Sequence, residues 1–189
     1  MAPFENVISL MERNDLIVED IRKVKVYVNQ RMYNTVCAPP ETKYRPRTVA
    51  DAMFSLPYVI GVALLRGDVS LGDFTSEAIK DPTYLQAVNK VEIIIDRDVD
   101  VESEKLNLPL SLDIIEIQTK NGGLFMEKKY YAKGFPENPM TMVDCAEKAK
   151  KCASYAVKPF PKERIDAMKE QGENLEKLTE IQSLTKLLT

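Results

Sequence analysis

The sequence contains no histidine among its 189 residues. Without an imidazole, the chain alone cannot supply a histidine general base, a Ser/His or Cys/His catalytic pair, or a histidine-ligated metal ion. Any chemistry in which this protein takes part must therefore use its other side chains or groups that another polypeptide provides.

Long apolar runs and paired cysteine motifs are also absent. No stretch reaches the roughly 18 consecutive apolar residues of a membrane span, and the N-terminus lacks the basic start and apolar core of a signal peptide. The three cysteines, Cys37, Cys145 and Cys152, form no CxxC pattern. We therefore predict a cytoplasmic protein, not inserted in a membrane, with buried free thiols.

The charges of the chain are balanced. It has 26 Lys and Arg against 29 Asp and Glu, a net charge of -3, 44% hydrophobic residues and 7 glycines. This profile is typical of a soluble globular protein, and nothing in it indicates nucleic-acid binding. The length predicts one domain, or a domain with an appendage, with a sizeable core.

The N-terminal part predicts a helix, a strand and a loop. Apolar residues at helical spacing predict a helix over residues 4–14. Val24, Val26 and Val28 alternate with more polar residues, as in a half-buried strand. Residues 35–47 are rich in proline and charge, which predicts a loop that serves either as a connector or as a ligand contact.

Residues 48–66 are apolar nearly all round, which is typical of a helix buried on several sides. Thr48 and Asp51 fit a capping box at its start. Pro57 removes a backbone donor, so it should kink or divide the helix and free a carbonyl near Met53. Another group has to satisfy that carbonyl.

The following segment predicts an α+β fold. Asn121-Gly122 provides the positive φ angles of a tight hairpin between two strands. Four strands, with helices between the first and second, predict a small antiparallel or mixed sheet with helices on one face. The expected elements are helices at 75–80 and 83–89, strands at 91–96, 112–119 and 124–131, and an acidic solvated loop at 96–104.

The composition changes after the proline-rich segment 133–139, and only helical patterns follow. We predict an α+β domain at 1–137 and a helical tail at 138–189. The tail comprises a helix over 142–155 opened by Thr141, a segment from Pro161, and a leucine stripe over 175–188. Such a stripe needs a surface to cover it, either the sheet domain or another chain.

Three local motifs are explained without chemistry. Gly122-Gly123 matches no phosphate-binding loop and fits a hairpin turn. The acidic run at 96–104 lacks the central glycine and the spacing of an EF-hand, so no metal site is predicted. Cys145 and Cys152 are seven residues apart and share a helix face, which suits core packing.

Basic residues and tyrosines remain as candidate site groups. Arg45 and Arg47, or basic residues around the first strand, can hold a carboxylate by charge-assisted hydrogen bonds, although exposed basic residues equally serve solubility. Phenols can donate or shuttle a proton, although most tyrosines pack their rings and satisfy the hydroxyl locally. The tyrosines in question are Tyr27, Tyr33, Tyr44 and Tyr58.

Three motifs occur in order along the chain: DIRKVKVYV at 20–28, AMFSLPYVIGVALLRG at 52–67 followed by FTSE at 74–77 and Asp81-Pro82, and GFPENPMT at 134–141. Together they resemble the C-terminal region of the MmgE/PrpD family, which includes 2-methylcitrate dehydratase, cis-aconitate decarboxylase and iminodisuccinate epimerase. The resemblance runs from about Phe4 to the C-terminus.

The resemblance implies a helical domain, formed by an N-terminal part and the last helices, and a smaller α+β domain between them. The active site would lie in the cleft. Family chemistry is proton abstraction next to a carboxylate of a di- or tricarboxylate, followed by loss of water, loss of carbon dioxide or reprotonation, with no redox cofactor. The family's catalytic Asp, His and Lys residues lie mostly before the point where this chain begins, which implies that an absent N-terminal half supplies the base.

At the matching positions, the resemblance implies roles for three residues. Tyr33 falls where a relative places a tyrosine lining the cleft, and we expect it to act in catalysis. Ser55 and Tyr58 belong to the Phe-Ser-Leu-Pro-Tyr motif, and the kink at Pro57 would let their polar groups or the freed backbone face the substrate. The alternative is that this motif only packs the domain.

The resemblance therefore predicts the C-terminal half or subunit of an MmgE/PrpD-like lyase or isomerase that binds a small carboxylate and needs no cofactor. Its partner would be a separately encoded N-terminal helical half, or further copies in a homo-oligomer. One alternative is a non-catalytic binding or oligomerisation module derived from the family. Another is a domain cut from a full-length enzyme.

Overall fold

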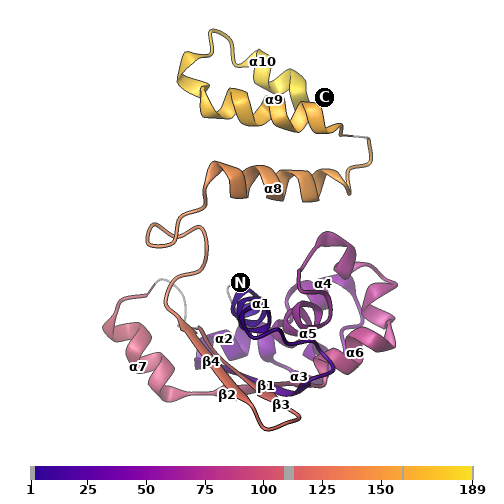
Figure 1. Cartoon of the computed structure of the whole chain (residues 1–189), viewed down its shortest axis with the longest axis vertical. Helices are drawn as coiled ribbons and strands as arrows, with labels where there is room; N and C mark the ends of the chain where they lie inside the picture. The colour runs from indigo at the N-terminus through magenta and orange to yellow at the C-terminus, as the bar shows by residue number, and fades with distance from the viewer. Residues whose placement is uncertain (1–2, 109–112, 159, 189) are drawn as a thin grey trace. The chain divides into compact units, whose positions relative to one another are not determined.

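The structure is a computed structural model that describes residues 3–108, 113–158 and 160–188. The chain divides into two compact units, Met1–Ala132 and Lys133–Thr189, here named unit 1 and unit 2. Unit 1 contains the four-stranded mixed sheet and the helices that pack on it, whereas unit 2 contains helices (Figure 1). The predicted α+β class is confirmed.

The sheet of unit 1 has the strand order β2-β1-β3-β4. Strand β1 (Ile21–Val28) runs parallel to β2 (Val91–Ile95) and antiparallel to β3 (Asp113–Thr119). Strand β3 pairs antiparallel with β4 (Leu124–Lys129) through the predicted hairpin. Leu112, predicted as the first residue of the third strand, lies outside the described residues.

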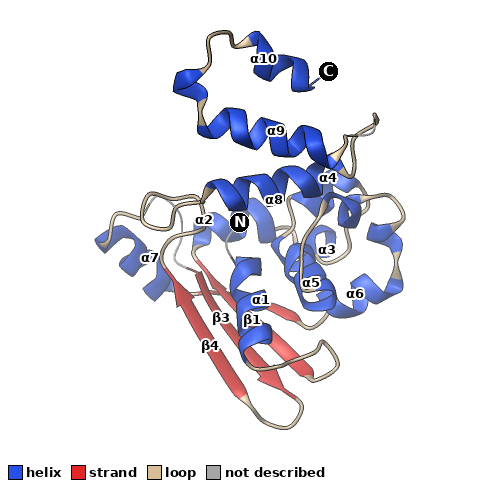
Figure 2. Cartoon of the chain, turned by 45° about the horizontal axis from the view of Figure 1, so that its top comes forward, coloured by secondary structure: helices blue, strands red, loops and turns tan. Residues whose placement is uncertain are grey.

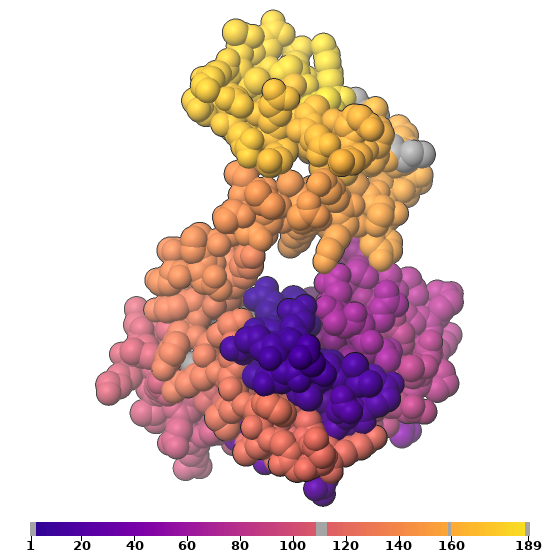
Figure 3. All heavy atoms as spheres, viewed as in Figure 1, coloured from indigo at the N-terminus to yellow at the C-terminus, as the bar shows by residue number. Residues whose placement is uncertain are grey.

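Helices α1 (Pro3–Arg13) and α5 (Leu56–Arg66) pack on one face of the sheet (Figure 2). Arg13 Nη2 donates to Glu127 Oε2 of β4 at 2.7 Å and ties the end of α1 to the hairpin. Figure 3 shows the indigo residues of α1 against the salmon residues of β4. The main core includes Val7, Leu10, Ile21, Val24, Val26, Val28, Leu56, Ile60, Ile115 and Ile117.

The opposite face of the sheet carries a polar network centred on Glu116 of β3. Its carboxylate accepts hydrogen bonds from Lys25 Nζ at 2.8 Å, Gln118 Nε2 at 2.7 Å and Tyr27 Oη at 3.2 Å. These donors, with Lys25 contributing most, lower the pKa of Glu116. Tyr27, a candidate proton donor from the sequence, is therefore engaged in this network.

The helix predicted over 48–66 is divided in two, as the position of Pro57 predicts. The first part, α4 (Val49–Met53), opens with the predicted capping box of Thr48 and Asp51. The proline lies in the first turn of α5, where its missing N–H leaves no intrahelical bond unmade. The division therefore separates two helices, each with a regular start.

Helix α5 packs closely on α6 (Pro82–Val88). A Cβ atom at Gly61 would lie 2.6 Å from Val88 Cγ2 and 2.8 Å from the Val88 nitrogen, so only glycine permits this approach. The helix predicted at 83–89 is confirmed as α6, whereas only the 3-10 turn η3 (Ala78–Lys80) forms within the helix predicted at 75–80. A further 3-10 turn, η2 (Leu71–Phe74), precedes it. A second apolar cluster forms here from Ala52, Tyr58, Val62, Ile79, Tyr84 and Val88.

The prediction of a loop over residues 35–47 is wrong for much of that segment. Helix α2 (Gln30–Met32) continues into the π-helical turn η1 (Tyr33–Cys37), and α3 (Pro40–Lys43) follows. Asn29 caps α2 by accepting the Met32 N–H at 2.7 Å, so the chain is already helical when it enters the proline-rich segment. The second proline then suits the first turn of α3.

The prediction of a solvated loop over residues 96–104 is also wrong, because they form helix α7 (Arg97–Lys105). Asp96 caps the helix by accepting the N–H of the second helical residue at 2.9 Å, and acidic residues in the first turn favour the helix dipole. Val99 and Ser103, four residues apart, are its buried positions. The alternation of acidic residues and valines in the sequence conceals this spacing.

Unit 2 contains α8 (Met142–Ala153) and α9 (Lys162–Glu173). The predicted capping box at Thr141 is confirmed, with Asp144 as its partner. Lys133 Nζ donates to the Asp144 carboxylate at 2.5 Å, and this bond with those from Thr141 lowers the pKa of Asp144 to about 2. Within the described residues, no helix of either unit is long and apolar enough to cross a membrane.

The leucine stripe at 175–188 does not form one helix. It is divided into η4 (Leu175–Lys177), α10 (Gln182–Thr185) and η5 (Lys186–Leu188). Ser183 Oγ donates to the Glu180 carbonyl at 2.8 Å, and such local side-chain bonds compete with a continuous helix.

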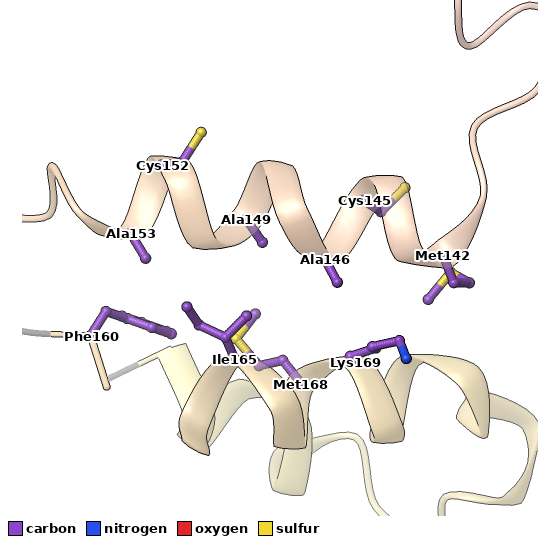
Figure 4. Close-up of a pocket in the computed structure, with 10 residues that line it drawn as sticks. All are labelled: Met142, Cys145, Ala146, Ala149, Cys152, Ala153, Phe160, Ile165, Met168 and Lys169. Atoms are coloured by element: carbon purple, nitrogen blue, oxygen red, sulfur yellow. The ribbon is translucent and has the colours of Figure 1, made fainter. Parts of the chain in front are cut away.

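Two of the three cysteines correct the prediction of buried thiols. Cys37 is buried, whereas Cys145 and Cys152 are exposed on α8. The two exposed thiols share one helix face, as the spacing predicts, and Figure 4 shows them pointing away from α9. The core side of α8 is the neighbouring face, which carries Ala146.

Asp113, at the start of β3, generates a prediction about stability and pH. It is 6% exposed, and burial raises its pKa to about 7. Because the folded state keeps the proton that the unfolded state loses near pH 4, stability should fall as the pH rises from about 4 to 7. Asp113→Asn should remove this penalty, stabilising the protein by up to about 4 kcal/mol above pH 7 and little near pH 4.

Urea denaturation at pH 4 and pH 8 measures this difference. Asp15→Asn is the matched control, because Asp15 is exposed and asparagine also tolerates its φ of 50°. An equal stabilisation by Asp113→Asn at both pH values would contradict the prediction.

Candidate functional site

The site residues predicted from the sequence fall within residues 33–58. Tyr33 opens the π-helical turn η1, is half-buried against the main core, and donates its N–H to the Asn29 carbonyl at 3.0 Å. Such π-helical turns are rare and occur frequently at functional sites. Cys37 closes the turn, and burial raises its pKa to about 12, so the thiol stays protonated and is no nucleophile near neutral pH.

Lys43, the last residue of α3, connects this segment to the break between α4 and α5. Its Nζ donates to the Phe54 carbonyl at 2.7 Å. In return, Ser55 Oγ donates to the Lys43 carbonyl at 2.5 Å and accepts the Tyr58 N–H at 3.1 Å. We name the two reciprocal bonds between Lys43 and residues 54–55 the Lys43 clamp.

Tyr44 lies next to the clamp and against β2. The pKa of the Tyr44 phenol is raised, and burial is the largest cause. A hydrogen bond with the Ile93 backbone lowers this pKa, whereas the nearby Cys37 and Tyr33 raise it further. Tyr33, Cys37 and Tyr44 are therefore close enough to interact electrostatically, next to the ammonium of Lys43. The Tyr44 phenol remains neutral near pH 7 and can donate a hydrogen bond or a proton.

Arg45 and Arg47 follow directly and are both exposed, whereas Pro46 between them is buried. The backbone N–H of Arg47 donates to Asp51 Oδ2 at 3.2 Å, which fixes the end of this loop to α4. The loop is thus anchored at several points while it presents two guanidinium groups to solvent. Guanidinium groups in this arrangement suit recognition of a carboxylate.

Ser55 and Tyr58 are fully buried and engaged within the domain. Tyr58 Oη donates to the Asp73 carbonyl at 2.7 Å, and its ring stacks on that of Tyr84 with centroids 6.2 Å apart. Burial also raises the pKa of Tyr58. The observed geometry is that of the packing alternative, and a substrate-binding role for Ser55 and Tyr58 stays a prediction.

The segment thus places two exposed guanidinium groups next to the partly buried Tyr44. Among the residues that the structure describes, no group of three or more His, Cys, Asp or Glu side chains could hold a metal ion. The family model for the MmgE/PrpD C-terminal domain matches residues 1–174. The chain belongs to the MmgE/PrpD family. A comparison with curated proteins gave no significant match.

The match confirms the suspected C-terminal region of the MmgE/PrpD family. Sequence reasoning missed Lys43 as a structural partner of the family motif. The sequence did predict a carbonyl near Met53 that needs a hydrogen-bond donor. The carbonyl that Lys43 satisfies belongs to the next residue, Phe54, so a search for this donor was the signal that could have found Lys43. Nothing in the local pattern around Lys43 indicates that it is buried.

The clamp generates a prediction for this MmgE/PrpD domain. Ser55→Ala removes the cap of α5 and the hydroxyl bonded to the Lys43 carbonyl, so it should lower the free energy of unfolding by about 2–4 kcal/mol. Urea denaturation followed by circular dichroism measures the loss. Ser76→Ala, at an exposed position of unit 1, is the control and should stay within about 0.5 kcal/mol. Equal stability of the two variants would show that the clamp contributes nothing.

Proposed function

We propose that this chain is the C-terminal part of an MmgE/PrpD-like enzyme that acts on a di- or tricarboxylate by proton abstraction. The reaction would be of the dehydratase, decarboxylase or epimerase type, and a cytoplasmic location belongs to the same proposal. One observation carries it: in a chain of this family, two exposed arginines lie on an anchored loop beside a cluster of phenols, and no histidine is present.

Substrate binding falls to Arg45 and Arg47. Charge-assisted bonds from guanidinium to carboxylate are among the strongest hydrogen bonds in proteins, and two such groups suit a substrate with two or three carboxylates. The Lys43 clamp, the buried Pro46 and the bond to Asp51 hold the loop, so little conformational entropy is lost when an anion binds.

Tyr33 is the proposed catalytic residue of this chain. Removing a proton next to a carboxylate builds negative charge on the carboxylate oxygens, and a phenol that donates a hydrogen bond there stabilises the transition state. Tyr44 keeps its proton near pH 7 because its pKa is raised, so it can support the same role. Neither phenol accepts the substrate proton in this scheme.

The base must come from another polypeptide or another part of the enzyme. Cys37 is protonated, because its pKa is about 12. Asp113 has a pKa near neutrality, but it is 6% exposed on the face of the sheet that α1 covers, beyond the reach of a substrate. We propose that a separately encoded N-terminal helical half supplies the base. The alternative partner of this chain is a further copy of itself in a homo-oligomer, which would not supply the base.

A complementation assay tests the proposal. The chain is mixed with the histidine-containing N-terminal half of a full-length MmgE/PrpD enzyme, and turnover of 2-methylcitrate, cis-aconitate and smaller dicarboxylates is measured. We expect turnover in the mixture only. Arg45→Ala should raise KM about tenfold or more with a smaller change in kcat, because it removes a charged hydrogen bond made in the ground state.

Arg22→Ala is the matched control, since Arg22 is an exposed arginine of β1 outside the anchored loop. Turnover by the chain alone would overturn the proposal. A mixture without turnover, together with a chain that binds none of these carboxylates, would favour a non-catalytic binding or oligomerisation module derived from the family.

A further inference from the structure

Helix α1 lies on the core face of the sheet in unit 1, against β3, β4 and α5 (Figure 2). Its buried stripe contains Val7, Leu10 and Met11, which belong to the main core. The four strands of the sheet pair only with one another, in the order β2-β1-β3-β4. Detachment of α1 would therefore cost the apolar contacts of this stripe, and it would leave the hydrogen bonds of the sheet intact.

One polar side chain interrupts the buried stripe of α1. Asn6 is 0% exposed, and in the described part of the chain no group forms a hydrogen bond with its Oδ1 or its Nδ2. Burial of an amide without a partner costs free energy, because water satisfies both atoms when they are exposed. This cost exists only while α1 is packed on the sheet, so it favours an open position of the helix.

A buried carboxyl group lies on the sheet under α1. Asp113, at the start of β3, faces the same side of the sheet as the core residues Ile115 and Ile117. Burial is the largest cause of its raised pKa of about 7, while the amino terminus and Lys129 of β4 lower this pKa and Glu5 of α1 raises it. Helix α5 carries no charged residue before its last position. Ionisation of Asp113 therefore adds a second cost to the packed position of α1.

The attachment at the C-terminal end of α1 offsets little of these costs. Arg13 pairs with Glu127 of β4, with Nη2 and Oε2 2.7 Å apart, but the arginine side chain is 58% exposed. Exposed ion pairs contribute little to stability. The helix is therefore held mainly by its apolar stripe, and the two buried polar groups oppose that packing.

We infer that α1 is a latch that opens from the sheet independently of the rest of unit 1, and more readily as the pH rises toward neutrality. The closed latch buries Asn6 and covers Asp113, whereas the open latch exposes both to water. An exposed aspartate releases its proton near pH 4, so the open form gains stability over the closed form between about pH 4 and 7. The gain levels off above about pH 7, where Asp113 is ionised in both forms. The inference is independent of the proposed function.

Hydrogen–deuterium exchange of the full chain, followed by mass spectrometry at about pH 5 and pH 7.5, tests the latch. Peptides from α1 and from the inner strand β1 are compared after correction for their intrinsic exchange rates. The α1 amides should exchange at least about tenfold faster than those of β1 at both pH values, because the latch opens without global unfolding. The equilibrium constant for opening of α1 should rise at least about tenfold between the two pH values.

Two variants test whether the buried polar groups are the cause. Asn6→Leu replaces the amide with an apolar side chain and should slow exchange of α1 at least about fivefold at both pH values. Glu12→Leu is the matched control, at an exposed position of the same helix, and should change exchange by less than about twofold. Asp113→Asn should abolish the dependence of α1 opening on pH, whereas the exposed control Asp15→Asn should keep it.

Equal exchange of α1 and β1 at both pH values would overturn the inference, because α1 would then open only when the whole unit unfolds. An opening of α1 that does not change with pH would also overturn it. So would faster exchange of α1 in Asn6→Leu, which would show that the amide stabilises the closed latch. The comparison of α1 with β1 in the native chain does not depend on the folding of any variant.

Discussion

The interruption of the apolar segment 48–66 at Pro57 is the constraint on which unit 1 depends. Because Ser55 captures the Tyr58 N–H, the Phe54 carbonyl has no partner within the helix, and Lys43 satisfies it. The Ser55 hydroxyl returns a bond to the Lys43 carbonyl. The unpaired carbonyl at the helix break therefore attaches the preceding segment, which carries the candidate site, to the start of α5.

This attachment places groups of different chemistry together. The clamp joins α3 to the break between α4 and α5, and Tyr44 and the loop with the exposed Arg45 and Arg47 follow α3 directly. Cys37, which stays protonated near neutral pH, ends the π-helical turn that Tyr33 opens. Under the proposed function, these residues would bind and polarise a carboxylate substrate, and a group outside them would remove the proton. The proposed function accounts both for the absence of histidine from the sequence and for the raised pKa values of Cys37 and Tyr44.

The sequence was most informative where one local rule dominates. The alternation of Val24, Val26 and Val28, the capping box at Thr48 and the turn at Gly122, with φ of 91°, each follow from backbone sterics or burial period, and each is confirmed. The loops predicted at 35–47 and 96–104 were wrong, because helix capping by Asn29 and Asp96 outweighs the preference of proline and charged residues for a loop. The burial of Ser55 and Lys43 was beyond reach, because it depends on contacts between segments that no local pattern encodes.

The central claim is that this chain binds a carboxylate substrate but cannot remove its proton. The most direct test is deuterium incorporation from D2O at the carbon next to a carboxylate of cis-aconitate or 2-methylcitrate, followed by NMR with the chain alone. The account predicts incorporation no faster than in buffer, since the chain has no histidine and the described site has no accessible base. Incorporation above that rate, abolished by Tyr33→Phe, would place the base within this chain and contradict the account.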